Sequence, residues 1–373
     1  MAEALPGLTM DMWTEILARL PVKSLMRLRC VCKSWCSLID SSYFSLLHLQ
    51  IYNNKPKYAI AMNCDKTAVY SIDTFRKIDE IFKTPFNCEV ICCKYGLILM
   101  CAFYAITPDE VDEDEMVFHN PCTRKSWSIP RCPYMTWTCW LGFAPSTNDY
   151  KVVAFVYDNS SIVVYSSNAN LWRIKDRSDA HVRGLLSFED ADEFYCKGAL
   201  CWLGFEKDKP PGVHNHLVSF DFDSEEFVFV DLPDALKQPG LVKINFVLSE
   251  SVAIFAMSSH SACIWVLVED GVDKIKSWRL WYTGDSNSKA HRFLTRGFRT
   301  VIFNVEKNTF ILSFRSNIFS YNFRSHRIQH LEDYYYSYFG IYMESLVVHN
   351  RNQRKILTYH NVNGEESTEL VRV

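Results

Sequence analysis

This sequence lacks a marked excess of either positive or negative charge. Its 373 residues include 40 Lys and Arg against 43 Asp and Glu, which gives a formal net charge of −3 at pH 7. Proteins that bind nucleic acid usually carry a basic excess gathered on one face. The balance therefore gives no reason to expect a nucleic-acid partner.

Hydrophobic segments long enough to span a membrane are also absent from the sequence. A bilayer-spanning helix needs roughly 20 consecutive apolar residues, and no stretch approaches that length. Residues 1–6 lack the basic flank and apolar run of a signal peptide. We therefore expect no membrane partner and a soluble protein of the cytoplasm, the nucleus or both.

The local motifs of common enzyme classes do not occur. There is no G-x-S-x-G nucleophile elbow, no G-x-x-x-x-G-K-[ST] phosphate loop and no G-x-G-x-x-G dinucleotide loop. Cys139 or Cys196 as a nucleophile would need a catalytic domain, and none is evident. His214 and His216 flank Asn215 near prolines, which favours an exposed polar loop over a metal site. We predict a protein that is not an enzyme and binds no cofactor.

The 14 cysteines need an explanation in a protein expected inside the cell. In a reducing compartment most cysteines are small buried hydrophobic residues rather than halves of disulfides. Cys88, Cys92, Cys93 and Cys101 come closest to a metal-binding set, but no second C-x-x-C pair and no His pair accompanies them. We predict structural cysteines and no metal.

Strong helical periodicity is present only near the N-terminus. Apolar residues at Met12, Trp13, Ile16, Leu17 and Leu20 draw one broad stripe along a helix. Asp11 stands where an N-cap or first-turn acid belongs. A proline at position 21 then interrupts the helix, because it removes a hydrogen bond and clashes with the preceding turn.

Two further short helices can follow that proline. The first would turn Val22, Leu25 and Leu28 inward, and the second has Val31, Trp35, Leu38 and Ile39 at helical spacing. Three helices this short expose more apolar surface than they can bury against one another. The unit therefore needs a partner or a neighbouring domain.

The run from Asp11 to Phe44 resembles an F-box. The resemblance rests on Glu15-Ile16-Leu17, Leu20-Pro21-Val22-Lys23-Ser24-Leu25 and Cys30-Val31-Cys32-Lys33-Ser34-Trp35. The motif commonly begins with Leu-Pro, where this chain has Leu8-Thr9. An F-box implies docking on a Skp-type adaptor. We assign to that interface, or to its support, Leu8, Met12, Trp13, Ile16, Leu17, Leu20, Pro21, Val22, Leu25, Leu28, Val31, Trp35 and Leu38.

From about Leu46 onward, short β-branched or aromatic runs alternate with turn residues, which indicates strands. One pattern, two strands joined by a turn, recurs six times at intervals of about 50 residues. Each hairpin follows one or two further strand candidates. The six hairpins are Val69–Ile78, Val117–Trp127, Val163–Trp172, Val218–Phe227, Ile264–Trp278 and Ile318–Ile328.

Four antiparallel strands at this period are typical of a β-propeller blade. We therefore expect an α+β chain in which a small three-helix F-box, residues 1–47, precedes an all-β domain, residues 48–373, folded as a six-bladed β-propeller. Ser345–His349 would pair with early strands and close the ring. Two ordinary β-sandwiches are the alternative, which the even spacing disfavours.

Three phrases resemble the F-box-associated domain of the large plant family that includes kelch-like and S-locus F-box proteins. They are Asn120–Lys125, Gly142–Val153, with its Asp-Tyr-Lys-Val-Val, and Gly198–Leu203. The third departs from the family pattern at Lys197 and Cys201. All three make sense as scaffold, because Asn-Pro and Asn-Asp start turns. The tryptophans could fill the wedges between blades; these are Trp127, Trp172 and Trp202.

Two stretches are candidates for contact with a target protein. An acidic run would attract a basic partner, although a solvated loop is the favoured interpretation. Its members are Asp109, Glu110, Asp112, Glu113, Asp114 and Glu115. The aromatic run Tyr334, Tyr335, Tyr336, Ser337, Tyr338 and Phe339 suits an interface or, equally, a buried strand.

Together the resemblances imply a substrate-receptor subunit of a Skp–cullin–F-box ubiquitin ligase. It would reach the cullin and RING subunits through the adaptor and hold an unknown target protein for ubiquitination and degradation. A second hypothesis is an F-box module that acts outside a ligase, as an assembly or sequestering factor. A propeller enzyme is the third, and it would need His or carboxylate residues converging from several blades, which the sequence does not show.

Overall fold

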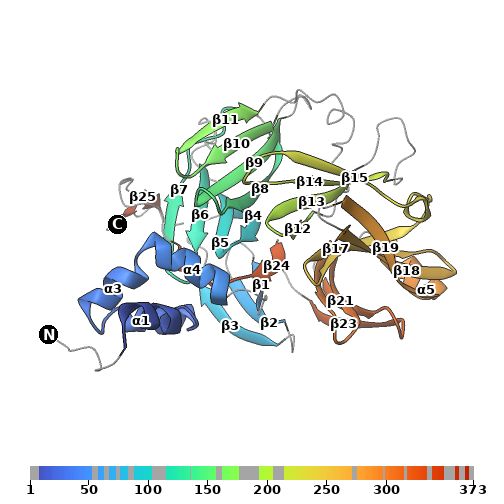
Figure 1. Ribbon diagram of the computed structural model, residues 1–373, viewed down its shortest axis with the longest axis horizontal. Coiled ribbons are helices and arrows are strands. Elements are labelled where there is room, and N and C mark those ends of the chain that lie inside the picture. Colours follow the sequence, from blue (N-terminus) through green and yellow to red (C-terminus); the bar gives the residue numbers. More distant parts are fainter. Residues whose placement is uncertain are drawn as a thin grey trace. The chain divides into compact units, whose positions relative to one another are not determined.

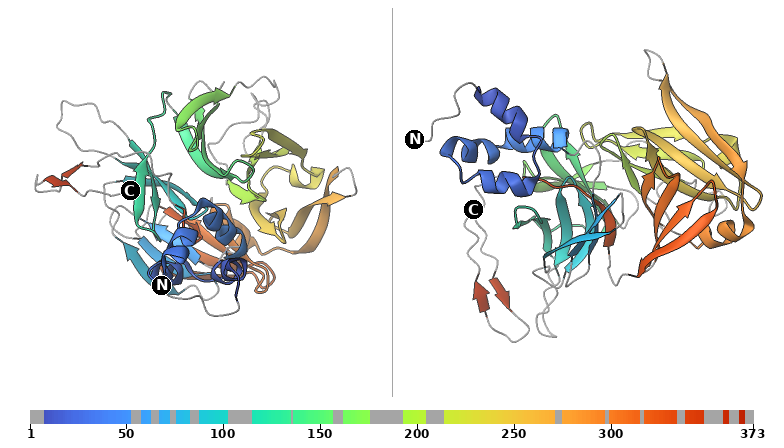
Figure 2. Two further views of the ribbon diagram at one scale, coloured as in Figure 1. Left: turned by 60° about the vertical axis from the view of Figure 1, so that its left-hand side comes forward. Right: turned by 90° about the horizontal axis from the view of Figure 1, so that it is seen from below.

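The structure is a computed structural model. It describes residues 8–52, 58–62, 67–72, 76–82, 88–102, 115–134, 136–156, 162–175, 193–204, 214–270, 275–296, 299–314, 317–333, 338–347, 358–360 and 366–368. Four helices come first: α1 (Met10–Leu17), α2 (Val22–Leu28), α3 (Lys33–Ile39) and α4 (Ser42–Tyr52). They form one small bundle (Figure 2). The predicted number of helices, three, is therefore wrong for the described residues.

Six four-stranded antiparallel sheets follow the helices, one for each blade of a six-bladed β-propeller (Figure 1). The first blade contains β24 (Tyr338–Tyr342), β1 (Tyr58–Met62), β2 (Thr67–Ser71) and β3 (Lys77–Phe82). The second contains β4 (Cys88–Lys94), β5 (Leu97–Ala102), β6 (Glu115–Asn120) and β7 (Lys125–Ser128). The third contains β8 (Thr136–Ala144), β9 (Asp149–Val156), β10 (Ile162–Ser166) and β11 (Leu171–Lys175).

The other three blades follow the same plan. The fourth contains β12 (Phe194–Cys196), β13 (Ala199–Gly204), β14 (His216–Phe220) and β15 (Phe227–Asp231). The fifth contains β16 (Val242–Leu248), β17 (Ser251–Met257), β18 (Ser261–Asp270) and β19 (Ile275–Asp285). The sixth contains β20 (Arg299–Asn304), β21 (Thr309–Phe314), β22 (Asn317–Asn322) and β23 (Arg327–Asp333). Outside the blades lie a 3-10 turn (Asp234–Leu236), α5 (Ser288–Leu294), β25 (Thr358–His360) and β26 (Glu366–Thr368).

The chain divides into two compact units. The first unites Met1–Lys55, Phe86–Arg131 and Met343–Val373, so that it holds the helical bundle, the second blade and the segment after β24. The second unit is Pro56–Pro85 with Cys132–Tyr342 and holds the other five blades. The predicted domain boundary at residue 47 falls inside α4 and remains a prediction.

All six predicted hairpins are confirmed as the last two strands of a blade. Four of their turns share one chemistry. The first residue accepts main-chain N–H or side-chain hydrogen bonds within its turn, and a residue four positions later has left-handed backbone. The first positions are Asn120, Ser166, Asp221 and Asn322, and the left-handed positions are Arg124, Asn170, Glu225 and His326. In these four blades a short polar side chain therefore stabilises the turn between the last two strands.

Closure of the ring differs from the prediction. β24 pairs antiparallel with β1, in a register that joins Tyr338 to Met62 and Tyr342 to Tyr58. The predicted closing strand, Ser345–His349, is wrong, because residues 343–347 form no strand. Val348 and His349 lie outside the described residues. The closing strand instead takes Tyr338 and Phe339 from the aromatic run, so a strand is confirmed for those two residues, although both are half-buried and not buried.

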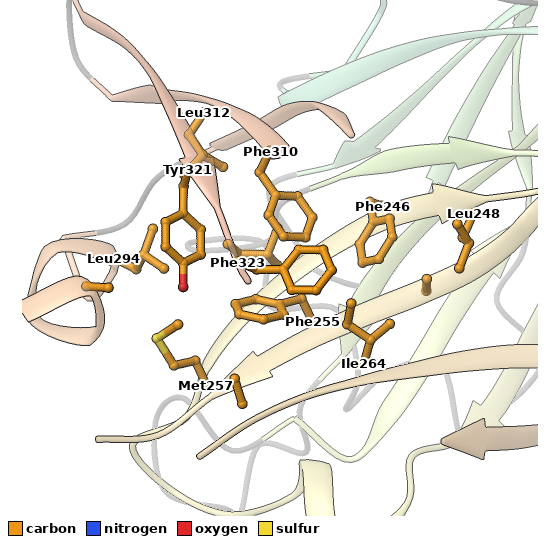
Figure 3. Close-up of a cluster of buried hydrophobic side chains, with 14 of the residues drawn as sticks. Phe246, Leu248, Phe255, Met257, Ile264, Leu294, Phe310, Leu312, Tyr321 and Phe323 are labelled. Carbon is orange, nitrogen blue, oxygen red and sulfur yellow. The ribbon is translucent and has the colours of Figure 1, made fainter. Parts of the chain in front are cut away.

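Aromatic side chains fill the space between the fifth and sixth blades (Figure 3). Phe246 and Phe255 meet Phe310, with ring centroids 5.1 and 5.3 Å apart. Tyr321 and Phe323 of the next hairpin complete the cluster. Such rings stabilise the contact between sheets both by their large apolar area and by edge-to-face geometry.

The three tryptophans expected in such wedges have different surroundings. Trp202 is fully buried and packs in a cluster with Phe155 of the third blade. Trp127 and Trp172 are only half-buried. Each contacts its cross-strand partner in its own blade, Phe118 or Tyr165, at 5.5 Å between ring centroids.

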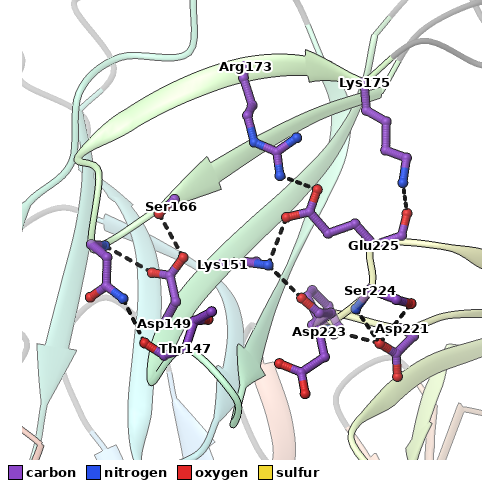
Figure 4. Close-up of polar contacts among 12 residues, drawn as sticks. Thr147, Asp149, Lys151, Ser166, Arg173, Lys175, Asp221, Asp223, Ser224 and Glu225 are labelled. Atoms are coloured by element: carbon purple, nitrogen blue, oxygen red, sulfur yellow. Dashed lines mark hydrogen bonds and ion pairs between the residues drawn. The ribbon is translucent and has the colours of Figure 1, made fainter.

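The Asp-Tyr-Lys phrase in β9 joins the third blade to the fourth (Figure 4). Asp149 is buried and accepts hydrogen bonds from the Ser166 and Ser167 hydroxyls at 2.6 and 2.9 Å, which fixes the turn of its own blade. Lys151 reaches across to the next blade. Its Nζ lies 2.7 Å from Oε1 of Glu225 and donates to the Phe222 carbonyl at 2.7 Å.

Arg173 completes this network by pairing with the other oxygen of the Glu225 carboxylate. Both Lys151 and Glu225 are buried. Burial opposes the charged form of Glu225, but the hydrogen bonds and charges of Lys151 and Arg173 outweigh it, so the pKa of Glu225 lies below its ordinary value.

Gly142 makes the same contact between blades possible. A Cβ at this position would lie 2.3 Å from the Phe222 ring, so no larger residue fits without displacing that ring. Tyr195 stacks on Phe222 and donates from its hydroxyl to the Leu141 carbonyl at 2.8 Å. The Gly-Phe phrase of the sequence is thus a packing requirement.

Glu225→Gln should destabilise the propeller by about 3–5 kcal/mol, because it leaves the buried Lys151 ammonium without its carboxylate. Urea denaturation at pH 7 measures the change. The matched control is Glu226→Gln at the exposed neighbouring position, where a change within about 0.5 kcal/mol is expected. Equal stability of the two variants would show that the ion pairs are dispensable.

The ion pairs of Glu225 also predict that the stability of the wild-type protein, relative to Glu225→Gln, depends on pH. Because the pKa of Glu225 is lowered in the folded state, its stabilisation is complete above the ordinary glutamate pKa of about 4.3 and is lost as the pH falls through the folded value. The difference in unfolding free energy between wild type and Glu225→Gln should therefore be constant from about pH 7 to 5 and shrink below about pH 4. A difference that grew on acidification would contradict the assignment.

Candidate functional site

The first F-box helix begins at the residue that departs from the family motif. Thr9 is the N-cap of α1, and its hydroxyl accepts a hydrogen bond from the Met12 N–H at 3.4 Å. Asp11 lies in the first turn, where its charge favours the helix dipole. A threonine at this position thus supplies a side-chain cap, which a proline could not.

The residues that precede the next two helices differ in how they cap them. α1 ends at Leu17, and Pro21 precedes α2 as its N-cap without a side-chain hydrogen bond. Cys32 precedes α3, where its sulfur accepts from the Trp35 N–H at 3.5 Å. The sequence pattern did not predict α4, because its apolar residues are distributed around the helix and do not form a single apolar face.

The bundle has a core of its own. Leu17, Val22 and Leu25 are buried, together with Ala18, Ile39 and Phe44. Four half-buried residues of the predicted adaptor set pack against this core, namely Leu20, Leu28, Trp35 and Leu38. Leu8 and Trp13 are half-buried as well. Leu17, Val22 and Leu25 of the predicted set therefore lie in the core of the bundle and not on its surface.

A second group of the predicted set points outward. Met12 and Ile16 are 48% and 43% exposed, and they lie one turn apart on the same face of α1. Val31 is 54% exposed, and Pro21 is exposed as well. Met10 and Tyr43 share this exposure but were not among the predicted residues. Large apolar side chains left in water are typical of an interaction surface.

Two tryptophans link the first and third helices. The rings of Trp13 and Trp35 lie 5.0 Å apart between centroids, tilted by 56°. Each is half-buried, so each ring keeps an accessible part. Tryptophan is among the residues most enriched at interface hot spots.

The outer charges of the bundle are mainly basic. Arg19 pairs with Glu15 at 2.8 Å, and Arg29 pairs with Asp40 at 2.6 Å. Among the described residues, Lys23, Arg27 and Lys33 are exposed and form no ion pair. The bundle therefore presents unneutralised positive charge together with its exposed apolar residues.

Most of the predicted target-binding residues lie outside the part of the chain that the structure describes. Asp109, Glu110, Asp112, Glu113, Asp114, Tyr334, Tyr335 and Tyr336 lie outside the described residues. Glu115 begins β6, and its side chain is likewise not described. All nine remain predictions.

No disulfide joins any two of the twelve cysteines whose side chains the structure describes. Burial raises the pKa of Cys93 and of Cys201 to about 12 and that of Cys196 to about 11, so these thiols stay protonated at neutral pH. A protonated thiol is a poor nucleophile and a poor metal ligand. In the described part of the chain, no group of three or more His, Cys, Asp and Glu could hold a metal ion.

The two candidate histidines are engaged by other side chains. His216 Nδ1 lies 2.7 Å from Oδ1 of Asp231, and His214 Nδ1 lies 3.5 Å from Nζ of Lys243. Across the described ranges, no helix combines the length and the apolar character that crossing a membrane requires.

Comparison with known protein families finds two matching domain models in this chain. The family model for the F-box domain matches residues 5–47, and the family model for the F-box associated beta propeller domain matches residues 40–353. A solved structure of a functionally unknown protein from Desulfotomaculum acetoxidans covers 74% of this chain and 79% of that chain, at 11% identity and a TM-score of 0.36, too distant a likeness to bear on function.

Relatives in Arabidopsis thaliana are named as F-box proteins. A probable F-box protein is 26% identical over 75% of this chain and 68% of its own length. An F-box/LRR-repeat/kelch-repeat protein is 26% identical over 74% of this chain and 76% of its own. A putative F-box protein is 25% identical over 75% and 80%. The chain belongs to the family of F-box proteins with an F-box-associated β-propeller domain.

Proposed function

We propose that this protein is the substrate receptor of a Skp–cullin–F-box ubiquitin ligase. The bundle α1–α4 would dock on a Skp-type adaptor and through it on the cullin and RING subunits. The propeller would hold a target protein for ubiquitination and degradation. The observation that carries the proposal is the outward-facing apolar set of Met12, Ile16 and Val31 on a bundle whose own core is already filled by other residues.

The division of α1 between core and surface supports this docking mode. Leu17 is buried, so it stabilises the bundle, while Met12 and Ile16 would lose their contact with water only when a partner covers them. The exposed Lys23, Arg27 and Lys33 would favour an adaptor with an acidic rim, and such complementarity mainly raises the association rate.

The contribution of such a receptor to the reaction is proximity. Holding the lysines of a target beside the ubiquitin-loaded conjugating enzyme raises their effective concentration, without any catalytic group on the receptor. We therefore propose a non-catalytic subunit that acts in the cytoplasm, the nucleus or both. The raised pKa values of the buried cysteines support the absence of a thiol nucleophile.

The alternative is an F-box module that binds the adaptor but works outside a ligase. Reconstitution separates the two. The full-length chain is combined with adaptor, cullin, RING subunit, conjugating enzyme and ubiquitin, and transfer to proteins that co-purify with the chain is followed. The ligase proposal expects transfer that requires this chain. Adaptor binding with no transfer to any co-purified protein favours the alternative.

Met12→Glu combined with Ile16→Glu should weaken adaptor binding by at least about 30-fold, the effect of losing one interface hot spot. Glutamate is tolerated within helices and both positions are exposed, so the bundle should stay folded. Binding of the purified adaptor, measured by calorimetry, checks the prediction.

The matched control is Leu171→Glu combined with Ile174→Glu, at two aliphatic residues of β11 that are 48% exposed. It should bind the adaptor as wild type does. Unchanged affinity of the α1 variant would refute this face of α1 as the docking surface. Substitution of Leu17 would be a weaker test, because a buried position also reports on folding.

A further inference from the structure

We infer that the segment Met343–Val347, here called the strap, fixes the F-box bundle on the second blade, and that Asn120 is the positioning residue that holds the strap. The strap directly follows the ring-closing strand β24 along the chain. It belongs to the same compact unit as the bundle and the second blade.

Asn120 grips the strap with its side-chain amide. It is fully buried at the end of β6, and its Nδ2 donates to the Ser345 carbonyl at 3.0 Å and to the Val347 carbonyl at 2.8 Å. Its Oδ1 accepts from the N–H groups of Cys122 and Thr123 at 2.9 and 3.3 Å. One side chain therefore shapes the β6–β7 turn with its oxygen and holds a segment 225 residues away with its nitrogen.

The turn between β4 and β5 also contacts the strap. Gly96 has a φ of +77°, and a Cβ there would lie 2.0 Å from the Cβ of Ser345. Both the left-handed backbone and the close approach require glycine. Ser345 is fully buried, and its hydroxyl accepts from the Val347 N–H at 3.0 Å, which keeps the strap bent.

The other side of the strap belongs to the F-box core. Leu346 is only 4% exposed and packs in the cluster of Leu17, Val22 and Leu25. Glu344 Oε2 accepts a hydrogen bond from the Val22 N–H at 3.4 Å, at the start of a helix where Pro21 provides no side-chain cap. Cys122, from the turn that Asn120 shapes, packs against the same cluster.

The amide nitrogen of Asn120 binds the strap and takes no part in the turn, which needs only the side-chain oxygen. Asp221 occupies the equivalent position of the β14–β15 turn, where its carboxylate accepts from the N–H groups of Asp223 and Ser224 at 2.9 and 2.7 Å. An aspartate thus makes the same kind of turn. What it lacks is the nitrogen that binds two strap carbonyls, and its charge would face those carbonyl oxygens instead.

The consequence for function rests on the proposed ligase role. A bundle held at one orientation on the second blade gives the adaptor, and everything bound to it, a fixed direction relative to that blade. Release of the strap would leave adaptor binding intact but remove this fixed orientation. The attachment itself can be tested without adaptor, cullin or target, so its failure is distinguishable from failure of the proposed function.

Asn120→Asp in the full-length chain is the decisive variant, followed by hydrogen–deuterium exchange. Peptides from α2 to α4 and from the strap should exchange at least about tenfold faster than in wild type, because two hydrogen bonds to a buried amide are lost. Peptides from β8 to β15 should be unchanged. The matched control is Asn322→Asp in the β22–β23 turn, where the amide donates to the Lys307 carbonyl at 2.7 Å; it should leave α2–α4 at wild-type rates.

Wild-type exchange of α2–α4 in Asn120→Asp would overturn the inference, as would equal acceleration in Asn322→Asp. Should Asn120→Asp fail to fold, Leu346→Ala decides the question from the F-box side, since it leaves the Asn120 hydrogen bonds in place. The strap then predicts faster exchange in α2–α4 with unchanged β6, and unchanged α2–α4 contradicts it. Adaptor affinity of the folded variant should equal that of wild type.

Discussion

Antiparallel pairing of β24 with β1 joins the last strand of the propeller to its first. A ring closed in this way gives β1 a partner on its second edge and makes a strand near residue 340 part of a blade begun near residue 58. The same pairing fixes where the chain goes next. Tyr342 ends the closing strand, and Met343 begins the strap that packs against the F-box core. Closure of the ring and attachment of the bundle thus depend on one continuous segment.

Polar side chains in the hairpin turns also make contacts with neighbouring parts of the structure, and these contacts differ from blade to blade. Four of the blades use a short acceptor at the first turn position, and the other atoms of that side chain, or a neighbouring residue of the turn, can make another contact. Asn120 uses its amide for the strap, while the turn that begins at Asp221 presents Glu225 to the buried Lys151 of the preceding blade. A shared turn chemistry can therefore carry contacts that differ from blade to blade, without a change in the blades themselves.

Sequence patterns predicted the hairpins because strand alternation and polar turns are local signals, and six hairpins at even spacing define six blades. The closing strand was misplaced because its partner, β1, is far away in sequence and Tyr338–Tyr342 gave no turn signal of its own. Spacing could not separate Leu17 from Met12 and Ile16, since adjacent stripes of one short helix are all apolar. Asn120 was recognised as a turn residue only, because its contacts to Ser345 and Val347 are invisible without the fold.

The sequence posed a choice for the under-buried helical unit, between a partner and a neighbouring domain. The structure gives the inner face a neighbour: Leu346 and Cys122 complete the core that Leu17, Val22 and Leu25 begin. Since the bundle is stabilised from within the chain, Met12, Ile16 and Val31 are not needed for its folding and stay in water. Several large apolar side chains exposed together on one small bundle are a feature of interaction surfaces. The strap therefore supports the proposal that an adaptor docks on the outer face of the F-box, because the residues of that face are not needed to stabilise the bundle.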